Sequence, residues 1–247
     1  MKVLITCGGS EIAGTIAAAV GKAHKVTLTD LPTGRAGTGA ATNALSHDEA
    51  TDKLVSGQQA IIHIGYGGQK GDAPALLDYY GRRTYNLLFA AANAGVERCI
   101  YISTLKLLQD YDENLTVTEK WRSHPPSDDP DLLACHIGES VCKEFARDRL
   151  VKVVTLRLGW PIVSGTRAQA ARSGETASLA TDDLARAVNE ALTANVEQWQ
   201  DVHVQSPVPN QRYLLHAAEK LLSFPSRPQP VDAQAAPAAR VSRKGVR

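Results

Sequence analysis

A glycine-rich segment that directly follows an apolar strand is the first feature of this chain that could carry chemistry. The strand is expected over residues 2–6, and an alanine-rich helix over 12–20. In a G-x-x-G-x-x-G loop the outer glycines serve the turn and the packing of helix on strand, and the central one lets a pyrophosphate approach the helix N-terminus. The segment consists of Gly8, Gly9, Ser10, Glu11, Ile12, Ala13 and Gly14.

With Gly8 and Gly14 at the outer positions, Glu11 holds the central one, and two interpretations of its carboxylate are open. If it is ionised about 4 Å from a phosphate charge, the repulsion costs about 4 kcal/mol at an effective dielectric constant of about 20, which is enough to remove micromolar affinity. Alternatively, it points into solvent at the start of the helix, where the helix dipole favours negative charge. The loop therefore predicts a nucleotide-binding type of fold and leaves the binding itself open.

A carboxylate, Asp30, ends the second expected strand, 25–29, about 20 residues after the loop. Asp30 would there accept hydrogen bonds from the hydroxyls of an adenosine ribose, which favours NAD over NADP. His63 and Gly65 close the strand expected over 59–64, at the edge of a parallel sheet where such folds bind ligands. The expected cofactor-binding residues are Gly8, Gly9, Ser10, Glu11, Ile12, Gly14, Asp30, His63 and Gly65.

Short apolar strands alternate along the chain with helices rich in alanine and leucine, which implies βαβ crossovers and a parallel sheet. We expect an α/β fold, a Rossmann-type doubly wound parallel sheet in a single domain at 1–222, with a small C-terminal substrate lobe at about 160–222. The segment 223–247 is rich in proline, alanine and arginine and should be a disordered tail. Further strands are expected at 98–102, 151–158 and 202–204, helices at 48–55, 74–94, 138–150, 181–195 and 213–222, and loops at 32–42, 105–131 and 161–178.

The composition argues against several classes of function. A net charge of +1 over 247 residues gives no electrostatic basis for binding nucleic acid or an anionic membrane. The four cysteines lack the spacing of a disulfide framework or a zinc site, and the histidines are scattered, so we expect reduced thiols and no metal. No charged leader precedes the first strand, and no apolar run approaches the roughly 20 residues that span a bilayer. We expect a cytoplasmic protein without a membrane or nucleic-acid partner.

Four segments carry a resemblance to a known family. Residues 86–104 read NLLFAAANAGVERCIYIST, and segments 61–65, 154–159 and 180–185 read IIHIG, VTLRLG and ATDDLA. The first is similar, nearly position for position, to NLLEAARAAGVKRFVYISS of the short-chain dehydrogenase/reductase superfamily, and the others resemble its VIHLA, TILRPG and HVDDLA. The chain thus resembles the extended branch of that superfamily, the NAD(P)-dependent sugar epimerases, dehydratases and dehydrogenases, and is most similar in size to the uronate dehydrogenases. The resemblance covers about 1–222 and implies an oxidoreductase or epimerase that uses NAD, or less readily NADP, on a sugar or sugar acid.

The family's Tyr-x-x-x-Lys pair is missing from the helix expected around 138–150, where two registers are open. One places Cys135 and Glu139 at the tyrosine and lysine positions, and the other places His136 and Ser140 there. Cys135 or His136 could exchange a proton near neutral pH, but neither Glu139 nor Ser140 supplies the positive charge by which the lysine assists the tyrosine. The first register is favoured because it keeps an apolar stripe at helical spacing, formed by Gly138, Val141, Cys142 and Phe145.

The resemblance implies three further roles for residues of this chain. Thr104 lies just after the strand expected over 98–102, where the family's serine or threonine binds the reacting hydroxyl or carbonyl. Arg167 and Arg172 lie in the loop expected over 161–178, where relatives hold their substrate, and a guanidinium there could bind a carboxylate or phosphate. The helices at 74–94 and 138–150 would pair two subunits into a homodimer.

Three functions remain open on this basis. The chain is an NAD-dependent oxidoreductase or epimerase with altered acid/base residues, among them Thr104, Cys135, His136 and Glu139. Alternatively, it is a catalytically inactive relative that binds a nucleotide or regulates a partner. The third reading is a lyase or isomerase that uses the same cleft without redox chemistry. Each of them implies a small-molecule substrate or a nucleotide as the ligand.

Overall fold

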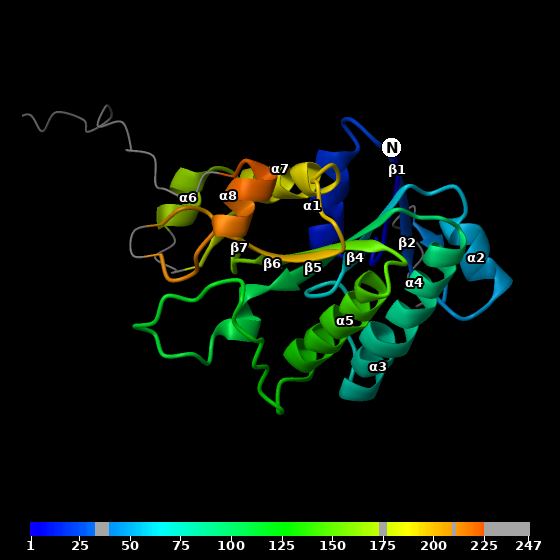
Figure 1. Cartoon of the computed structure of the whole chain (residues 1–247), viewed down its shortest axis with the longest axis horizontal. Helices are drawn as coiled ribbons and strands as arrows, with labels where there is room; N and C mark the ends of the chain where they lie inside the picture. The colour runs from blue at the N-terminus through cyan, green and yellow to red at the C-terminus, as the bar shows by residue number, and fades with distance from the viewer. Residues whose placement is uncertain (33–39, 173–176, 209–210, 225–247) are drawn as a thin grey trace, which may run out of the picture.

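A sheet of seven parallel strands forms the centre of the molecule (Figure 1). The structure is a computed structural model that describes residues 1–32, 40–172, 177–208 and 211–224. The strand order is β3-β2-β1-β4-β5-β6-β9, so the winding reverses between β1 and β4. This confirms the predicted doubly wound α/β sheet, with its switch point at the carboxyl ends of β1 and β4. The strands are β1 (Lys2–Ile5), β2 (Lys25–Asp30), β3 (Ala41–Thr42), β4 (Ala60–Ile64), β5 (Arg98–Thr104), β6 (Lys152–Leu158) and β9 (Trp199–Val204).

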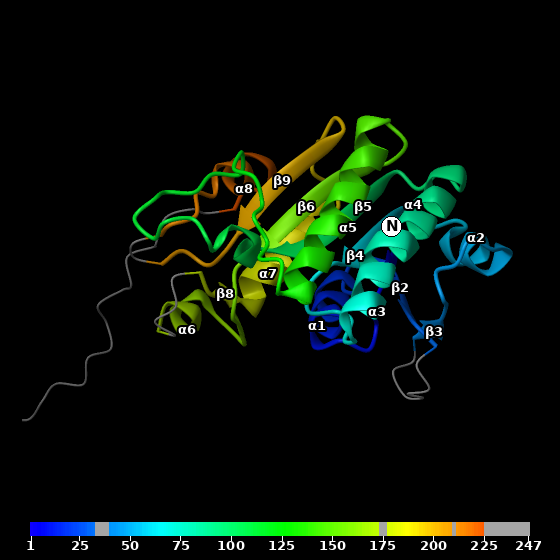
Figure 2. The same ribbon diagram turned by 90° about the horizontal axis from the view of Figure 1, so that it is seen from below.

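Helices cover both faces of this sheet (Figures 1 and 2). One face carries α1 (Glu11–Val20), α7 (Thr181–Ala191) and α8 (His216–Leu222). The other carries α2 (Glu49–Val55), α3 (Ala73–Asp78), α4 (Thr84–Asn93) and α5 (Pro130–Arg147). Because both faces are covered, the inner strands are apolar almost throughout, and all five residues of β4 are buried.

Two helical segments differ from their predicted bounds. The helix predicted over 74–94 is divided into α3 and α4 by η1 (Tyr79–Arg83), a π-helical turn whose two tyrosines are buried. Helix α5 begins at Pro130, ahead of the predicted residue 138, because Asp129 caps it: the carboxylate accepts a hydrogen bond from the backbone N–H of Leu132, at 3.0 Å. Proline at the first helical position needs no N–H partner.

The two long predicted loops also hold some regular structure. Segment 105–131 contains η2 (Leu105–Leu108), a 3₁₀ turn, and segment 161–178 contains β7 (Ile162–Val163) and α6 (Arg167–Arg172). Strand β7 pairs in parallel with β8 (Leu179–Ala180) in a small separate sheet. These short elements lie beyond the carboxyl ends of the main strands and shape that end of the molecule.

The disordered tail is predicted to begin at residue 223, but Phe224 is buried in the main core. Residues 225–247 lie outside the described residues. All four cysteines are buried free thiols. Within the described part of the chain, no helix combines the length and the apolar character needed to cross a bilayer.

Candidate functional site at the carboxyl edge of the sheet

The turn between β1 and α1 has three key positions, each held by a small residue other than glycine. Cys7 has φ +54°, a left-handed conformation that usually favours glycine, at the position where the first glycine of such a loop makes the tight turn. Ser10 is the N-cap of α1, and its hydroxyl accepts a hydrogen bond from the N–H of Ala13, at 3.2 Å. Ala13 is fully buried where the helix packs on the sheet. Cys7 therefore holds the turn position, Ser10 the position where a phosphate approaches, and Ala13 the position where the helix packs on the sheet.

This geometry shifts the predicted loop register by one residue. Gly8 packs against β2, because a Cβ atom there would lie 3.0 Å from that of Ala40 and 3.1 Å from that of Leu28. A Cβ at Gly14 would meet nothing within 4 Å, so no close packing requires glycine at that position. Glu11 is the exposed first residue of α1, which favours the solvent-facing interpretation of its carboxylate. The helix-packing position predicted for Gly14 is therefore held by Ala13, and of the two interpretations of Glu11 the structure favours the solvent-facing one.

Asp30, at the end of β2, is held against the loop before α1. Its Oδ2 accepts a hydrogen bond from the N–H of Gly9 at 2.8 Å, and its Oδ1 accepts from the N–H of Leu31 at 2.8 Å. Oδ1 also accepts from Nε2 of Gln69 at 2.9 Å, and the same amide contacts Sγ of Cys7 at 3.5 Å. The loop after β4 therefore reaches across to the loop after β1, and Asp30 joins the two.

His63, predicted to lie in the cofactor site, is a core residue instead. It is fully buried, with Nδ1 2.8 Å from Oγ1 of Thr6 and Nε2 2.8 Å from Oγ1 of Thr84. The Thr84 hydroxyl donates to the carbonyl of Tyr79 and Thr6 accepts from the N–H of Ile64, so the pattern fits a neutral ring that carries its proton on Nε2. Burial lowers the pKa of His63 to about 3. With both ring nitrogens engaged, His63 has no polar atom left for a ligand.

Gly65 and Gly138 make room for the ring of Tyr101, which passes between them. A Cβ at Gly65 would come within 2.1 Å of Cζ of Tyr101, and a Cβ at Gly138 within 2.0 Å of its hydroxyl oxygen. The buried hydroxyl donates to the carbonyl of Cys135 at 3.0 Å. Gly65 therefore serves packing, and so does Gly138 on α5.

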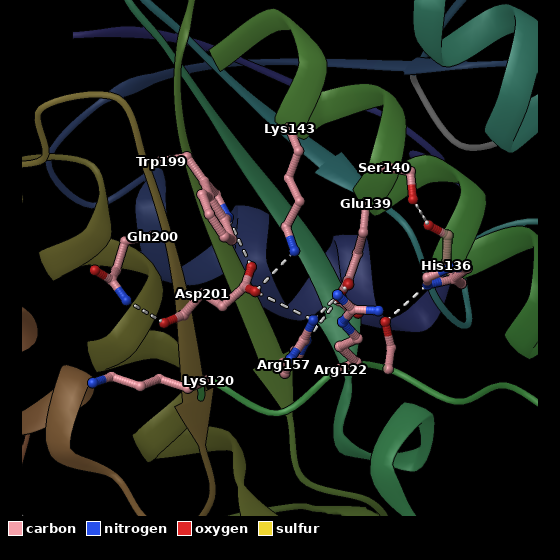
Figure 3. A network of polar contacts seen from close by, with 12 residues as sticks. Lys120, Arg122, His136, Glu139, Ser140, Lys143, Arg157, Trp199, Gln200 and Asp201 are labelled. Atoms are coloured by element: carbon pink, nitrogen blue, oxygen red, sulfur yellow. Dashed lines mark hydrogen bonds and ion pairs between the residues drawn. The ribbon is translucent and has the colours of Figure 1, made fainter. Parts of the chain in front are cut away.

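The lysine position of the favoured register belongs to a buried ion-pair network (Figure 3). Glu139 accepts two hydrogen bonds from the guanidinium of Arg157 on β6, at 3.0 and 2.8 Å, and a third from the hydroxyl of Ser103, at 2.6 Å. Arg157 lies 3.3 Å from Asp201 on β9, whose carboxylate also pairs with Nζ of Lys143 at 3.1 Å. Two carboxylates and two cations thus balance in a network that ties α5 to β6 and β9.

The residues of the two registers lie on different sides of helix α5. Cys135 and Glu139 are buried against the sheet, whereas Ser140 is exposed and His136 is half-buried. Burial raises the pKa of Cys135 to about 12, so the thiol stays protonated at neutral pH. Burial lowers the pKa of His136, whose Nδ1 lies 2.8 Å from the hydroxyl of Ser123. Neither register presents a proton carrier beside a free ammonium group.

Thr104 and Arg167 are engaged in local structure. The Thr104 side chain is fully buried and caps η2, accepting a hydrogen bond from the N–H of Lys106 at 3.2 Å. Arg167 pairs with the buried Asp183 of α7, its Nε lying 2.7 and 2.9 Å from the two carboxylate oxygens. This pair joins α6 to α7 and engages the guanidinium that is predicted to anchor a substrate. Arg172 is exposed at the end of α6.

Three residues that the sequence analysis did not select meet at the carboxyl edge, and we call them the edge cluster. They are Tyr66, Lys106 and Trp160. The ammonium of Lys106 donates to the hydroxyl of Tyr66 at 3.2 Å and lies 5.2 Å from the ring centroid of Trp160. Tyr66 and Trp160 meet edge to face with 5.5 Å between ring centroids. Each of the three lies two residues after the end of a strand: Tyr66 after β4, Lys106 after β5 and Trp160 after β6. This common spacing is the feature of the sequence that could have identified the edge cluster.

The described residues provide two other observations about ligand sites. A cavity of about 480 Å³ lies at the opposite edge of the sheet, lined by Ala146, Arg149, Val151, Lys152, Glu197 and Gln198. No group of three or more histidine, cysteine, aspartate or glutamate side chains is arranged to hold a metal ion there or elsewhere in the described ranges. The cavity is thus separate from the carboxyl edge, where Asp30 and the edge cluster lie.

Comparison with solved structures identifies the fold. Glucuronic acid dehydrogenase from Chromohalobacter salexigens superimposes with a TM-score of 0.73 at 21% identity, over 92% of this chain and 84% of that one. Uronate dehydrogenase from Agrobacterium tumefaciens gives a TM-score of 0.73 at 17% identity, with the same coverage. UDP-N-acetylglucosamine 4-epimerase from Bacillus cereus gives 0.69 at 16% identity, over 91% and 93% of the two chains.

The fold is that of the short-chain dehydrogenases. A short-chain dehydrogenase/reductase superfamily protein from Agrobacterium tumefaciens with bound NAD also matches, with a TM-score of 0.65 at 19% identity, over 93% of both chains. No protein-family model and no curated protein matches the sequence. The short-chain dehydrogenase fold that the sequence resemblance implied is confirmed, and identities of this size establish the fold alone.

Proposed function

We propose that this protein binds NAD at the edge formed by β1, β2 and β4 and acts as an oxidoreductase or epimerase on a sugar or sugar acid. The observation that carries the proposal is the carboxylate of Asp30 beside the N-terminus of α1, hydrogen-bonded to Gly9 at 2.8 Å. A carboxylate in this place binds the hydroxyls of an adenosine ribose and repels the additional phosphate of NADP, so NAD is the expected form.

The loop residues of this chain fit a pyrophosphate. Small side chains at Cys7 and Ser10 leave room for a pyrophosphate at the start of α1, where the backbone N–H groups and the helix dipole favour an anion. Ser10 adds a hydroxyl that can donate to a phosphate oxygen. Glu11 is exposed, so the repulsion expected between a central carboxylate and the pyrophosphate does not arise.

Relatives by fold support the ligand class. One matched structure is the Agrobacterium tumefaciens uronate dehydrogenase in a mutant form complexed with NAD, and another is MoeE5 in complex with UDP-glucuronic acid and NAD. Sugar acids and their nucleotide conjugates are therefore the substrates to test first. When bound, NAD⁺ would supply the hydride acceptor for oxidation of a sugar hydroxyl.

Replacing Asp30 by alanine should weaken NADH binding by about 10- to 100-fold, the value of hydrogen bonds to a charged acceptor. Calorimetric titrations with NAD⁺, NADH and NADPH measure this, and Asp52→Ala, which removes an exposed carboxylate on α2, is the matched control. If the wild-type protein binds none of them at millimolar ligand, the proposed function is wrong. An unchanged dissociation constant for Asp30→Ala would refute the placement of the ribose.

A second candidate is a catalytically inactive relative that binds the nucleotide and regulates a partner. It is favoured by Glu139, which stands in the favoured register at the lysine position and is neutralised by Arg157 inside the core. Binding of NADH without turnover of any sugar acid or nucleotide sugar would support this candidate over the enzyme.

We further propose that the protein forms a homodimer through α4 and α5. Two large apolar side chains of α4, Tyr85 and Phe89, are 48% and 36% exposed and stack on each other, and Phe145 of α5 packs edge to face on Tyr85. Phe89→Asp should convert a dimer to a monomer in light scattering after size exclusion. Leu115→Asp, at an exposed position in segment 105–131, should leave the mass unchanged, and a monomeric wild-type protein would contradict the proposal.

The four buried free thiols support a reducing, cytoplasmic location for this protein. We propose a cytoplasmic location on this basis, and small molecules as the ligands.

A further inference from the structure

The loop that follows β4 connects the proposed nucleotide site to the edge cluster. Gly68 lies so close to the loop after β1 that a Cβ there would be 2.8 Å from Sγ of Cys7, and the next residue, Gln69, binds Asp30. Gly67 has φ +70°, a conformation that glycine adopts without strain, and the ring of Trp160 lies 3.7 Å from where its Cβ would be. Tyr66 is therefore carried on the segment that touches the proposed nucleotide site.

A phenol and an ammonium group meet beside this segment. Nζ of Lys106 donates a hydrogen bond to the hydroxyl of Tyr66 at 3.2 Å and lies 5.5 Å from the centroid of its ring. Both side chains are partly exposed, so water and a small molecule can reach them. In contrast, Cys135 and Glu139, which stand at the corresponding positions of α5, are buried and committed to other contacts. None of the predicted catalytic residues combines an accessible proton carrier with a cation at hydrogen-bond distance.

The chemistry of this contact is that of proton transfer. A cationic donor at the oxygen of a phenol stabilises the phenolate, so more of the phenol is in the form that can take a proton from a neighbouring hydroxyl. Trp160 covers the ammonium with its ring, which restricts the positions that Lys106 can adopt and keeps Nζ on the phenol.

We propose that Tyr66 and Lys106 are the proton-transfer pair of this protein and replace the Tyr-x-x-x-Lys pair that α5 lacks. The inference rests on the proposed function, since it concerns oxidation of a sugar hydroxyl at the same edge. When bound, NAD⁺ would accept the hydrogen of the substrate carbon together with its bonding electron pair. The hydroxyl proton passes to the phenolate oxygen of Tyr66 and returns from there to water. The alcohol thus becomes a carbonyl by losing one hydride and one proton, and Lys106 is hydrogen-bonded to the Tyr66 oxygen without being consumed.

A first test needs no cofactor and no substrate. Tetranitromethane nitrates phenolates in preference to phenols, and peptide mass spectrometry locates the modified tyrosine. We expect Tyr66 to be nitrated faster than Tyr111, a partly exposed tyrosine whose hydroxyl donates to a backbone carbonyl. Lys106→Met should slow nitration of Tyr66, because it removes the cation at hydrogen-bond distance from the oxygen. Lys106→Arg should keep most of the rate.

A second test uses NAD⁺ with D-glucuronate or UDP-glucuronate, followed by NADH absorbance. Tyr66→Phe removes one oxygen atom and should lower kcat by about 10²- to 10⁴-fold, the usual contribution of a general acid or base, with little change in the dissociation constant for NADH. Tyr111→Phe is the matched control and should keep the wild-type rate. Lys106→Arg should restore part of the activity that Lys106→Met loses.

The outcomes separate this inference from the proposed function. Absence of NAD binding by the wild-type protein defeats the proposed function, and the nitration rates then decide whether the pair exists. Tight NAD binding with equal turnover by wild-type and Tyr66→Phe defeats the pair and leaves the nucleotide site standing. Equal nitration of Tyr66 in the wild-type and Lys106→Met proteins likewise overturns the inference.

Discussion

Glu139→Ala should lower the free energy of unfolding by about 3–5 kcal/mol, because it leaves the guanidinium of Arg157 buried with half of its counter-charge removed. Arg157 is 1% exposed and Glu139 2% exposed, so water cannot replace the lost partner. The Ser103 hydroxyl loses its acceptor in the same variant. Urea denaturation followed by circular dichroism measures the change.

Two matched variants show whether the loss comes from the unpaired charge. Glu139→Met combined with Arg157→Met replaces both charges by apolar groups of similar length and should recover most of the stability, since Asp201 keeps Lys143 as its partner. Glu144→Ala removes an exposed member of an ion pair with Arg147 on the same helix and should cost less than about 1 kcal/mol. A loss of only that size for Glu139→Ala would show that water reaches Arg157 and that the network adds little to stability.

Acidification from pH 7 to pH 5 should destabilise the protein by about 4 kcal/mol through two buried histidines. Burial lowers the pKa of His63 to about 3 and that of His203 to about 3, against about 6.5 for both in the unfolded chain. Their contribution to stability is complete above pH 6.5 and is lost as the pH falls from there through 3, because the unfolded state takes up protons that the folded state cannot. At pH 5 each histidine costs about 2 kcal/mol.

The pH dependence of urea denaturation between pH 7 and pH 5 tests this expectation. His63→Gln and His203→Gln should each remove about half of the slope, even where the substitution itself lowers stability at neutral pH. His216→Gln, at an exposed position on α8, serves as the control and should keep the slope. If both buried variants retain the full wild-type slope, the destabilisation at acid pH comes from other groups.

In this chain, the space between α5 and the sheet holds charges that satisfy one another: Glu139 with Arg157, and Asp201 with Lys143. Such a network stabilises the fold only as a whole, so its members are poor candidates for proton exchange with a substrate. The proposal that proton transfer is carried by Tyr66 and Lys106 follows from this occupancy.

Local features of the sequence were sufficient for the architecture. Apolar runs such as residues 60–64 predicted buried parallel strands, because a strand covered on both faces has no polar side to show. The apolar stripe around Gly138 and Phe145 also predicted which side of α5 faces the sheet, because helical spacing alone decides which residues share a face. Asp30 could also be placed at the end of β2 from the sequence, because the strand period and the position of the loop are both visible in a short stretch of sequence.

The sequence by itself thus determined the order of strands and helices, the doubly wound sheet and the absence of a Tyr-x-x-x-Lys pair. Only the tertiary structure decided that the loop positions are Cys7, Ser10 and Ala13, because the start of α1 depends on the Ser10 cap and on the left-handed turn at Cys7. It also decided that His63 and Glu139 are enclosed in the core while Tyr66 and Lys106 meet at its edge. Tyr66 and Lys106 are 40 positions apart and come within hydrogen-bond distance because two neighbouring parallel strands end side by side. Local sequence patterns carry no information on where the side chains beyond those strand ends point.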